Sequence, residues 1–199
     1  MTARALFPQA IGPDWAHLPE AVRRMHRPVA SEGFSGRARV ERGDGLVSQL
    51  LATLFRFPPE MPDTTVRLGK QRDAQGETWE RDFGGSVFRT RLRAGGPGAV
   101  RERLGPFEFE LGLPLSENGV DVTVRRGWFL GAPLPKPLLP VSRSREFAAV
   151  GRCCFDIAVY APLGFGLIVR YRGWLEPDAE SDPELGPAPE PAIKTVGSL

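Results

Sequence analysis

The sequence has little cysteine and little histidine, which limits the cross-links and metal sites that it can form. Its two cysteines, Cys153 and Cys154, are adjacent. A disulfide between neighbouring residues is strained and rare, so we expect no disulfide framework. Its two histidines, His17 and His26, lie nine residues apart rather than at the spacing of a helical metal pair. We therefore predict no metal and no other cofactor, and we expect both histidines on the surface or at helix caps.

Long apolar runs are also absent. No stretch approaches the roughly 18 residues that a membrane-spanning helix needs, and the N-terminus has no basic-plus-apolar signal segment. We therefore expect no transmembrane segment and a cytoplasmic location. Glycine and proline, by contrast, are abundant, with 23 and 20 residues of 199. This content is too high for a helical bundle and suits a fold with many turns.

Lysine is scarce, and charge is divided unevenly along the chain. Arginine supplies 23 of the 26 basic residues, and the net charge is only +2. Residues 1–175 nevertheless carry 25 basic and 18 acidic groups, whereas residues 176–191 carry six acids and no base. We predict one folded domain over residues 1–176 and an acidic, proline-rich, disordered tail over residues 177–199.

The basic body does not show the pattern of a nucleic-acid surface. Arg89, Arg91 and Arg93 alternate along a predicted strand, but the aromatic Phe88 falls on the opposite face. A sheet that binds single-stranded nucleic acid needs aromatic side chains among the basic ones on one face. We therefore expect no nucleic-acid partner, and we interpret most of the arginines as solvated residues on strand faces.

Two segments in the N-terminal half have helical spacing. Residues 18–26 form the first, and its apolar positions share one stripe: Leu18, Val22 and Met25. Residues 46–57 form the second, and its apolar positions recur at near-helical spacing: Leu46, Leu50, Leu51, Leu54, Phe55 and Phe57. The second helix ends at Pro58-Pro59 because proline cannot continue a helix.

From residue 64 onward the apolar period changes to two, as expected of strands. The connections are short and force antiparallel neighbours, because a parallel crossover needs a dozen or more residues. We predict an α+β fold with two helices in its N-terminal half and a strongly curved, mostly antiparallel sheet. The sheet has about eight or nine strands, residues 100–113 forming one of them. It either wraps the helix at 46–57 or closes as a half-barrel or barrel, which can enclose a small-ligand cavity.

Four separated blocks of the sequence resemble a known family. The blocks are Gly36–Gly43 with the helix that follows, Arg81–Gly85, Gly127-Trp128 with Gly131–Pro135, and Val169–Leu175. In this order they resemble the bacterial domain-of-unknown-function family numbered 4166, over Trp15 to Leu175. The resemblance implies no known activity and no catalytic residues. Some members look like C-terminal partners of nucleotide-binding oxidoreductase domains, which implies a role in docking on such a domain.

Asp156 is the first candidate site residue. It lies in the apolar strand 153–160, on the face opposite to Cys153, which we expect to pack as a small hydrophobic residue. If the face of Asp156 turns inward, its carboxylate needs a partner, and arginines of neighbouring strands offer one: Arg143, Arg145, Arg170 and Arg172. If that face is solvated instead, Asp156 forms an ordinary cross-strand pair. Both interpretations stay open at this point.

The tripeptide Arg-Gly-Trp occurs twice, at Arg126–Trp128 and at Arg172–Trp174, each time at the end of a predicted strand. Glycine permits a bulge or a close backbone approach, and tryptophan adds a large amphipathic surface. On one interpretation, the two arginines and the two tryptophans line one mouth that grips an anionic or aromatic ligand. On the other, both tryptophans plug the ends of the barrel.

These observations favour a binding module over an enzyme. We predict that an apolar β cavity with a rim of arginine and tryptophan holds a small amphipathic or anionic ligand. The alternative is an accessory domain that docks on a separately encoded nucleotide-dependent oxidoreductase, through its arginine face or the segment 133–140. An enzyme with Asp156 or Glu146 as base lacks a second titratable group at recognisable spacing, so we predict no catalytic residues. The predicted ligand-binding residues are Arg126, Trp128, Arg143, Arg145, Asp156, Arg170, Arg172 and Trp174.

Overall fold

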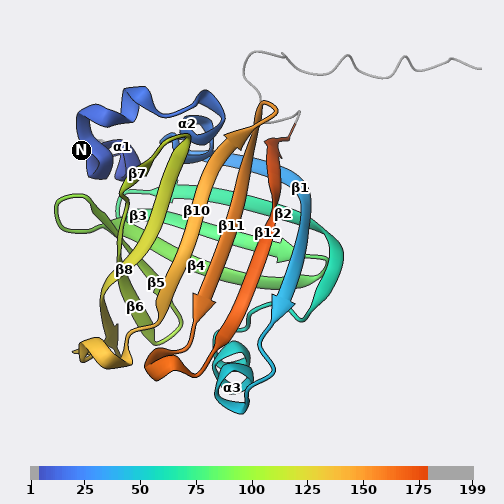
Figure 1. The fold of residues 1–199 in the computed structure, drawn as a ribbon. Coiled ribbons are helices and arrows are strands. Elements are labelled where there is room, and N and C mark those ends of the chain that lie inside the picture. The colour runs from blue at the N-terminus through green and yellow to red at the C-terminus, as the bar shows by residue number, and fades with distance from the viewer. Residues whose placement is uncertain (1–4, 179–199) are drawn as a thin grey trace, which may run out of the picture.

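The computed structural model describes residues 5–178, which fold into a closed antiparallel barrel (Figure 1). In the order in which they pair around the barrel, its ten strands are β10 (Val141–Ala149), β11 (Arg152–Tyr160), β12 (Leu167–Pro177), β1 (Ser31–Arg42), β2 (Met61–Asp73), β3 (Gly76–Phe83), β4 (Ser86–Ala94), β5 (Ala99–Leu104), β6 (Phe107–Gly112) and β8 (Gly119–Phe129). β8 also pairs with β10, which closes the ring. The predicted tail at 177–199 lies outside the described residues, apart from Pro177 and Asp178.

The strand count exceeds the predicted eight or nine. Residues 100–113, predicted as one strand, form β5 and β6, because the chain turns at Gly105. Gly105 has φ of +58°, in the left-handed region that favours glycine. Two short strands, β7 (Leu115–Ser116) and β9 (Ala132–Pro133), pair with β8 beyond the ring. The antiparallel pairing and the barrel closure are confirmed, and the predicted count is wrong.

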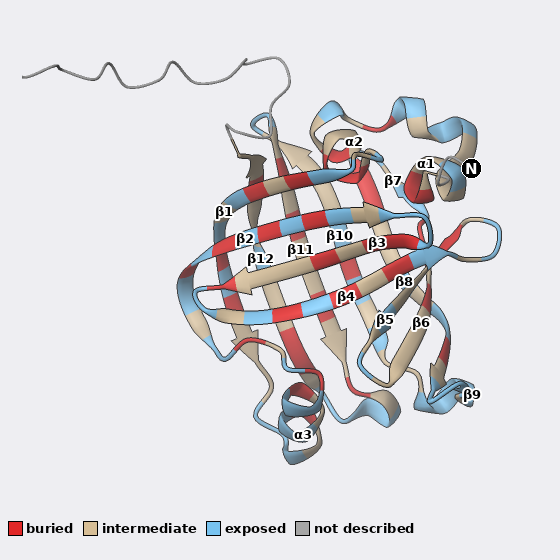
Figure 2. Cartoon of the chain, turned by 180° about the vertical axis from the view of Figure 1, so that it is seen from behind, coloured by how far each residue is buried: buried red, intermediate tan, exposed pale blue. Residues whose placement is uncertain are grey.

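The alternation that predicted the strands separates an inward from an outward face. On β2, Val66 and Leu68 are buried between exposed neighbours, and on β11, Cys153 and Phe155 are buried between half-buried ones. Figure 2 shows the same alternation of buried and exposed residues along β2. Closing the sheet gathers the inward apolar side chains into one core and leaves few unpaired edges.

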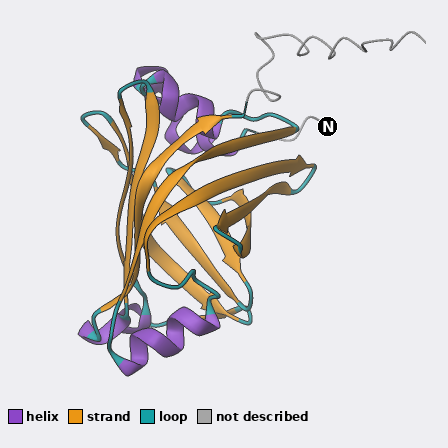
Figure 3. Ribbon diagram, turned by 90° about the vertical axis from the view of Figure 1, so that its right-hand side faces the viewer, coloured by secondary structure: helices purple, strands orange, loops and turns teal. Residues whose placement is uncertain are grey.

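Short helices cover one end of the barrel (Figure 3). They are α1 (Leu6–Ile11), the 3-10 helix η1 (Gly12–His17) and α2 (Glu20–His26). The predicted stripe of Leu18, Val22 and Met25 is buried against the barrel, as expected. α1 was not predicted, because six residues are too few to show a helical period. No helix within residues 5–178 has both the length and the apolar composition needed to cross a membrane.

The third α-helix, α3 (Leu46–Leu54), lies outside the barrel at the other end (Figures 1 and 3). Leu46, Leu50 and Leu54 of its apolar stripe are 85%, 69% and 51% exposed. Its buried residues are Ser48 and Ala52, whose small side chains let the helix lie close to β12. A sheet wrapped around this helix is therefore the wrong one of the two predicted arrangements, because strand side chains occupy the inside of the barrel.

Candidate functional site

Inside the barrel lies a partly open cavity of about 180 Å³. Its walls are mainly aromatic and aliphatic, and they extend from Met25 of α2 at one end to Phe55 and Phe57, which follow α3, at the other. A few polar side chains interrupt this lining: Arg81, Thr90, Glu102, Ser142, Ser144, Glu146 and Tyr171. An apolar chamber with a few convergent polar groups is the usual form of a small-molecule site.

Arg81 is the cation of the cavity. It occupies an inward position of β3, in phase with Trp79, and its Cζ atom lies 5.1 Å from the centre of the Trp79 ring. Its Nη1 atom donates a hydrogen bond of 2.8 Å to Oγ1 of Thr90 on β4. A guanidinium has five N–H donors in a planar fork, so this bond leaves other donors for a bound molecule.

Glu102 balances the charge of Arg81. It takes an inward position of β5 between Val100 and Leu104, and its Oε1 atom lies 3.5 Å from Nη1 of Arg81. The side chains of Arg81 and Glu102 are only 18% and 23% exposed. Together they give the apolar chamber a local dipole rather than a net charge, which suits a group that both accepts and donates hydrogen bonds.

A second polar pair lies toward the N-terminal helices. Nε2 of His26, the last residue of α2, is hydrogen-bonded to Oε2 of Glu146 on β10. His26 is 2% exposed, and its ring centre lies 4.0 Å from that of Phe7 and 5.5 Å from that of Trp79. The predicted surface or capping position is therefore wrong for His26, because α2 turns its last residues into the barrel. It is right for His17, which is exposed.

The environment of Glu146 keeps its carboxylate ionised. Burial raises the pKa of this carboxyl, but the charge and hydrogen bond of His26, helped by Arg81 and Lys70, bring it below its ordinary value. The pair thus ties the end of α2 to the wall of the barrel. Because Nε2 of His26 is already bonded to Glu146, that nitrogen is not free to act as a base toward the cavity.

The remaining titratable groups of the cavity are neutral at ordinary pH. Burial raises the pKa of Tyr171 to about 12, so its hydroxyl stays protonated and can donate a hydrogen bond. Burial also raises the pKa of the Cys153 thiol, which excludes a reactive thiolate. Cys153 is buried among apolar residues, as predicted. Among residues 5–178, no three His, Cys, Asp or Glu side chains gather where they could hold a metal ion.

A buried lysine also anchors the N-terminal helices. Lys70 of β2 is 3% exposed, and its Nζ atom donates hydrogen bonds to the carbonyl oxygens of Met25 at 2.5 Å and Arg27 at 3.3 Å. The last carbonyls of a helix carry partial negative charge, so an ammonium group is favourable there. Glu32 lies 3.5 Å from Nζ, while burial lowers the pKa of Lys70.

The predicted site residues lie on the outer face of the barrel rather than in its cavity. Asp156 accepts two hydrogen bonds from Arg170, from Nε at 2.7 Å and from Nη2 at 2.5 Å. The cross-strand pair is thus the correct interpretation, and an inward Asp156 is wrong, because the odd-numbered residues of β11 face inward. Arg172, on the same outer face, donates a hydrogen bond of 2.5 Å to Glu41.

Two further predicted arginines lie against outer aromatic rings. The Cζ atom of Arg143 is 5.2 Å from the ring centre of Tyr160, and that of Arg145 is 5.3 Å from the ring centre of Phe147. Both residues alternate along β10 with Ser144 and its inward neighbours, which line the cavity. Arg145 stands directly opposite Asp156 where β10 pairs with β11, but the carboxylate of Asp156 is hydrogen-bonded to Arg170.

The two Arg-Gly-Trp segments lie at opposite ends of the barrel and do not share a mouth. β8 and β12 run in opposite directions, because β10 and β11 stand between them and every pairing is antiparallel. Trp174 lies beneath Arg152 on the outer face, and Trp128 beneath Arg101, so neither ring plugs an end. The predicted close approach at glycine is confirmed, since a Cβ atom on Gly173 would lie 2.1 Å from a backbone oxygen.

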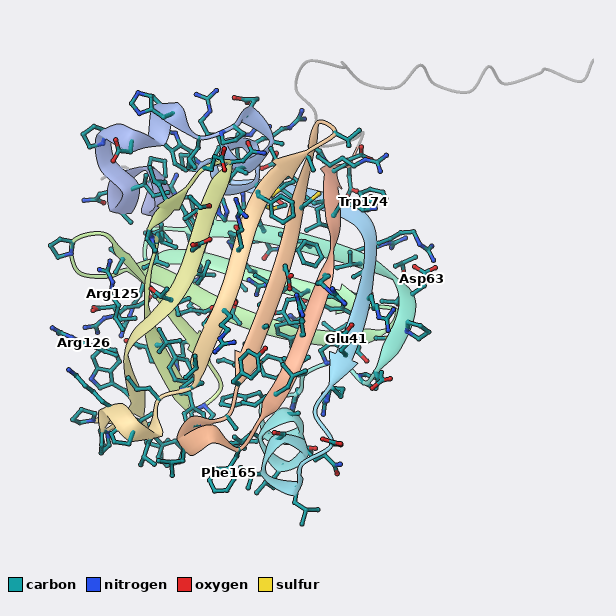
Figure 4. All side chains as sticks on the ribbon, viewed as in Figure 1. Glu41, Asp63, Arg125, Arg126, Phe165 and Trp174 are labelled. Carbon is teal, nitrogen blue, oxygen red and sulfur yellow. The ribbon has the colours of Figure 1, made fainter. Side chains whose placement is uncertain are left out.

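Arg126 and Trp128 border an open groove of about 630 Å³ on the outer surface. Arg125 and Lys136 also line it, and Figure 4 shows Arg125 and Arg126 on the same side of the barrel. Its one lining acid is Glu110, which lies 3.8 Å from Arg126 and 3.7 Å from Arg101. The groove therefore carries a net positive charge.

The sequence did not predict the polar residues of the cavity, although the positions of some of them were a detectable signal. Arg81 shares a strand face with Trp79 and Phe83, and Glu102 alternates with Val100 and Leu104. A charged residue at an inward position between apolar ones is such a signal. The pairing of His26 with Glu146 left none, since the two lie 120 residues apart.

The comparison with known proteins agrees with the four blocks found in the sequence. Residues 18–175 match the family described as Domain of unknown function (DUF4166). No curated protein matches the chain. The matched region contains all ten strands of the barrel, apart from the end of β12, together with α2 and the cavity residues. The chain thus belongs to the family described as Domain of unknown function (DUF4166).

Proposed function

We propose that this protein binds a small amphipathic molecule inside its barrel, with an uncharged polar group between Arg81 and Glu102. The observation that carries the proposal is this pair, two charges 3.5 Å apart in a cavity with mainly apolar walls. Replacing a buried ion pair by apolar residues of similar size often leaves a protein equally or more stable. Folding alone therefore does not account for the pair, whereas recognition of a polar group does.

The charges around the cavity favour an uncharged polar group over an anion. Glu102 and Glu146 both border the cavity, and Arg81 and His26 are each engaged with one of them. A ligand carboxylate at Arg81 would lie beside Glu102, and like charges repel strongly where water is excluded. A hydroxyl or amide group can accept from Arg81 and donate to Glu102. Of the predicted amphipathic and anionic ligands, we therefore infer the amphipathic one.

The volume of the cavity limits the size of the ligand. A cavity of about 180 Å³ is comparable to the roughly 150 Å³ engineered cavity that holds benzene. It is smaller than the roughly 300–1,000 Å³ typical of sites for drug-sized ligands. One ring or a short aliphatic chain with one polar substituent fits this space, with the apolar part against Phe55, Phe88 and Phe109.

Three probes of similar size test the proposal: benzyl alcohol, toluene and benzoate. Their affinities for the full chain are measured by ligand-observed NMR and calorimetry. We expect benzyl alcohol to bind most tightly and benzoate least. The double variant Arg81→Leu/Glu102→Leu removes both charges together, so it should keep toluene binding and lose the preference for the alcohol.

Arg89→Gln is the matched control, because Arg89 lies on the outer face of β4 and pairs with Glu80 there. It should show the native order of affinities. A folded native protein that binds none of the three probes, or that binds benzoate best, contradicts the proposal. Docking on an oxidoreductase stays a prediction, since no contact within residues 5–178 bears on it.

A further inference from the structure

Exposed hydrophobic side chains gather at the end of the barrel where α3 lies. Of the twelve large hydrophobic residues exposed in the described part of the chain, nine belong to this end. Three are leucines of α3, namely Leu46, Leu50 and Leu54. Four lie in the segment 129–141, from the last residue of β8 to the first of β10, and Leu163 and Phe165 lie between β11 and β12. Scattered exposed hydrophobic residues are normal on soluble proteins, but a contiguous group marks a contact surface. We call this group the α3-end patch.

The segment 160–167 touches both of the other segments of the α3-end patch. Ser48 of α3 donates a hydrogen bond of 3.0 Å to the backbone oxygen of Phe165. The 3-10 helix η3 (Pro162–Gly164) lies against η2 (Lys136–Leu138) of the segment 129–141. Figure 4 shows Phe165 at this end, beside α3, and Figure 2 shows α3 and β9 with many exposed residues. The patch is therefore one surface, formed by the tips of three segments.

Two leucines of the patch have a backbone conformation that disfavours leucine. Leu130 and Leu163 have φ of 49° and 57°, in the left-handed region where glycine and asparagine are preferred. Both side chains are exposed, at 75% and 65%, so packing does not explain them. Val150 shares this conformation and exposure but stands alone in the turn between β10 and β11 at the other end.

Charged residues are few at the α3-end patch. α3 itself has none, and the exposed Asp44, Arg56 and Glu60 flank it. Residues 129–141 and 160–167 contain no acid and a single base, Lys136. Lys136 also lines the outer groove, together with Arg125 and Arg126. The groove has one lining acid, Glu110, which already lies between Arg101 and Arg126. An apolar surface with a cationic groove at its side is complementary to a surface of apolar chains beneath anionic groups.

From this arrangement we propose that the α3 end of the barrel docks on a lipid bilayer that contains anionic lipids. The exposed leucines and phenylalanines enter the interfacial layer, and the cationic groove meets the headgroups. A protruding set of apolar tips suits a bilayer, which needs no complementary shape, better than a protein, which does. The argument uses surface residues alone, so it stands apart from the ligand proposed for the cavity.

Flotation of the full chain with lipid vesicles tests this proposal. We expect binding to phosphatidylcholine vesicles that contain about 30% phosphatidylglycerol, and weaker binding to phosphatidylcholine alone. The variant Leu46→Ser/Leu50→Ser/Leu54→Ser should lose at least about tenfold in affinity for both vesicles. The variant Arg126→Gln/Lys136→Gln should lose the preference for the anionic vesicles and keep the weaker binding to the neutral ones.

Two matched variants serve as controls. Leu115→Ser/Val150→Ser removes exposed apolar side chains at the other end of the barrel, and Arg67→Gln/Arg89→Gln removes exposed arginines from its wall. Both should bind vesicles as the native chain does, and thermal melting should show that every variant is folded. The proposal is overturned if the native chain binds neither kind of vesicle. It is also overturned if the leucine variant binds vesicles as the native chain does. A dimer in sedimentation that the leucine variant abolishes while vesicle binding is absent overturns it as well, because a second copy then covers the patch.

Discussion

The two ends of the barrel use apolar side chains in opposite ways. At the end covered by α1 and α2, Val22 and Met25 are buried, and Lys70 and the His26–Glu146 pair fix the helix from inside. At the other end, α3 attaches through Ser48, Ala52 and the half-buried Leu51, and it leaves Leu46, Leu50 and Leu54 exposed. One helix therefore completes the core, whereas the other presents an apolar surface.

This contrast shows that an apolar stripe does not by itself say what it packs against. Both helices have apolar residues at helical spacing, and they lie at opposite ends of the same barrel. What differs is the partner. α2 meets a barrel opening lined by apolar side chains. α3 meets the outside of β12 through Ala52, with Val47 and Leu51 beside it. The following substitutions test this difference, beginning with the largest expected effect.

Lys70→Met should destabilise the helix-covered end most. It leaves the carbonyl oxygens of Met25 and Arg27 without their donor, and it leaves Glu32 with less compensation for its buried charge. We expect a loss of about 4 kcal/mol in the free energy of unfolding, measured in urea. Lys136→Met, at the other end, should cost less than about 0.5 kcal/mol. Equal losses for the two variants would remove the distinction between the ends.

Glu146→Gln should cost about 2 kcal/mol at neutral pH, because it weakens the tie between α2 and β10. The pKa of Glu146 is lower in the folded protein than its ordinary value. The carboxylate therefore adds stability above the ordinary pKa of about 4.3, and this stability is lost as the pH falls further. Denaturation at several pH values should show that the difference in the free energy of unfolding between the native protein and the variant becomes smaller in acid. A difference that becomes larger in acid would contradict the pairing of Glu146 with His26.

Asp156→Asn should have a small effect, because the pair with Arg170 lies on the outer face and each side chain is about one-third exposed. We expect a loss of about 0.5 kcal/mol, reduced further by salt. Binding of the cavity probes should not change. If the variant loses probe binding but keeps native-like stability, Asp156 contributes to ligand binding.

Leu50→Ser should leave the free energy of unfolding within about 0.5 kcal/mol of the native value, because the side chain is exposed. Val22→Ser, at a buried position of α2, is the matched comparison and should cost about 2 kcal/mol. Chemical denaturation of the two variants gives both values. A large loss for Leu50→Ser would show that Leu50 packs against the fold.

The sequence predicted the sheet better than the site. The period of two after residue 64 indicated the strands and their antiparallel pairing, and the one division that it missed, at Gly105, lies in a turn short enough to be hidden in that period. The site prediction selected arginine, tryptophan and aspartate by residue type. Which face of a strand is inward had to be known first, and Asp156 and Arg172 lie on the wrong one.

Period, turn residues and composition are local properties, and they were enough for an α+β fold with a curved antiparallel sheet, because each strand's alternation is written in its own residues. The closure of β8 on β10, the meeting of His26 with Glu146 and the exposure of the α3 leucines are not local. They depend on which surfaces meet once the ring has closed. The contacts between these distant segments decide whether an apolar or charged side chain lies in the core, in a cavity or on a contact surface.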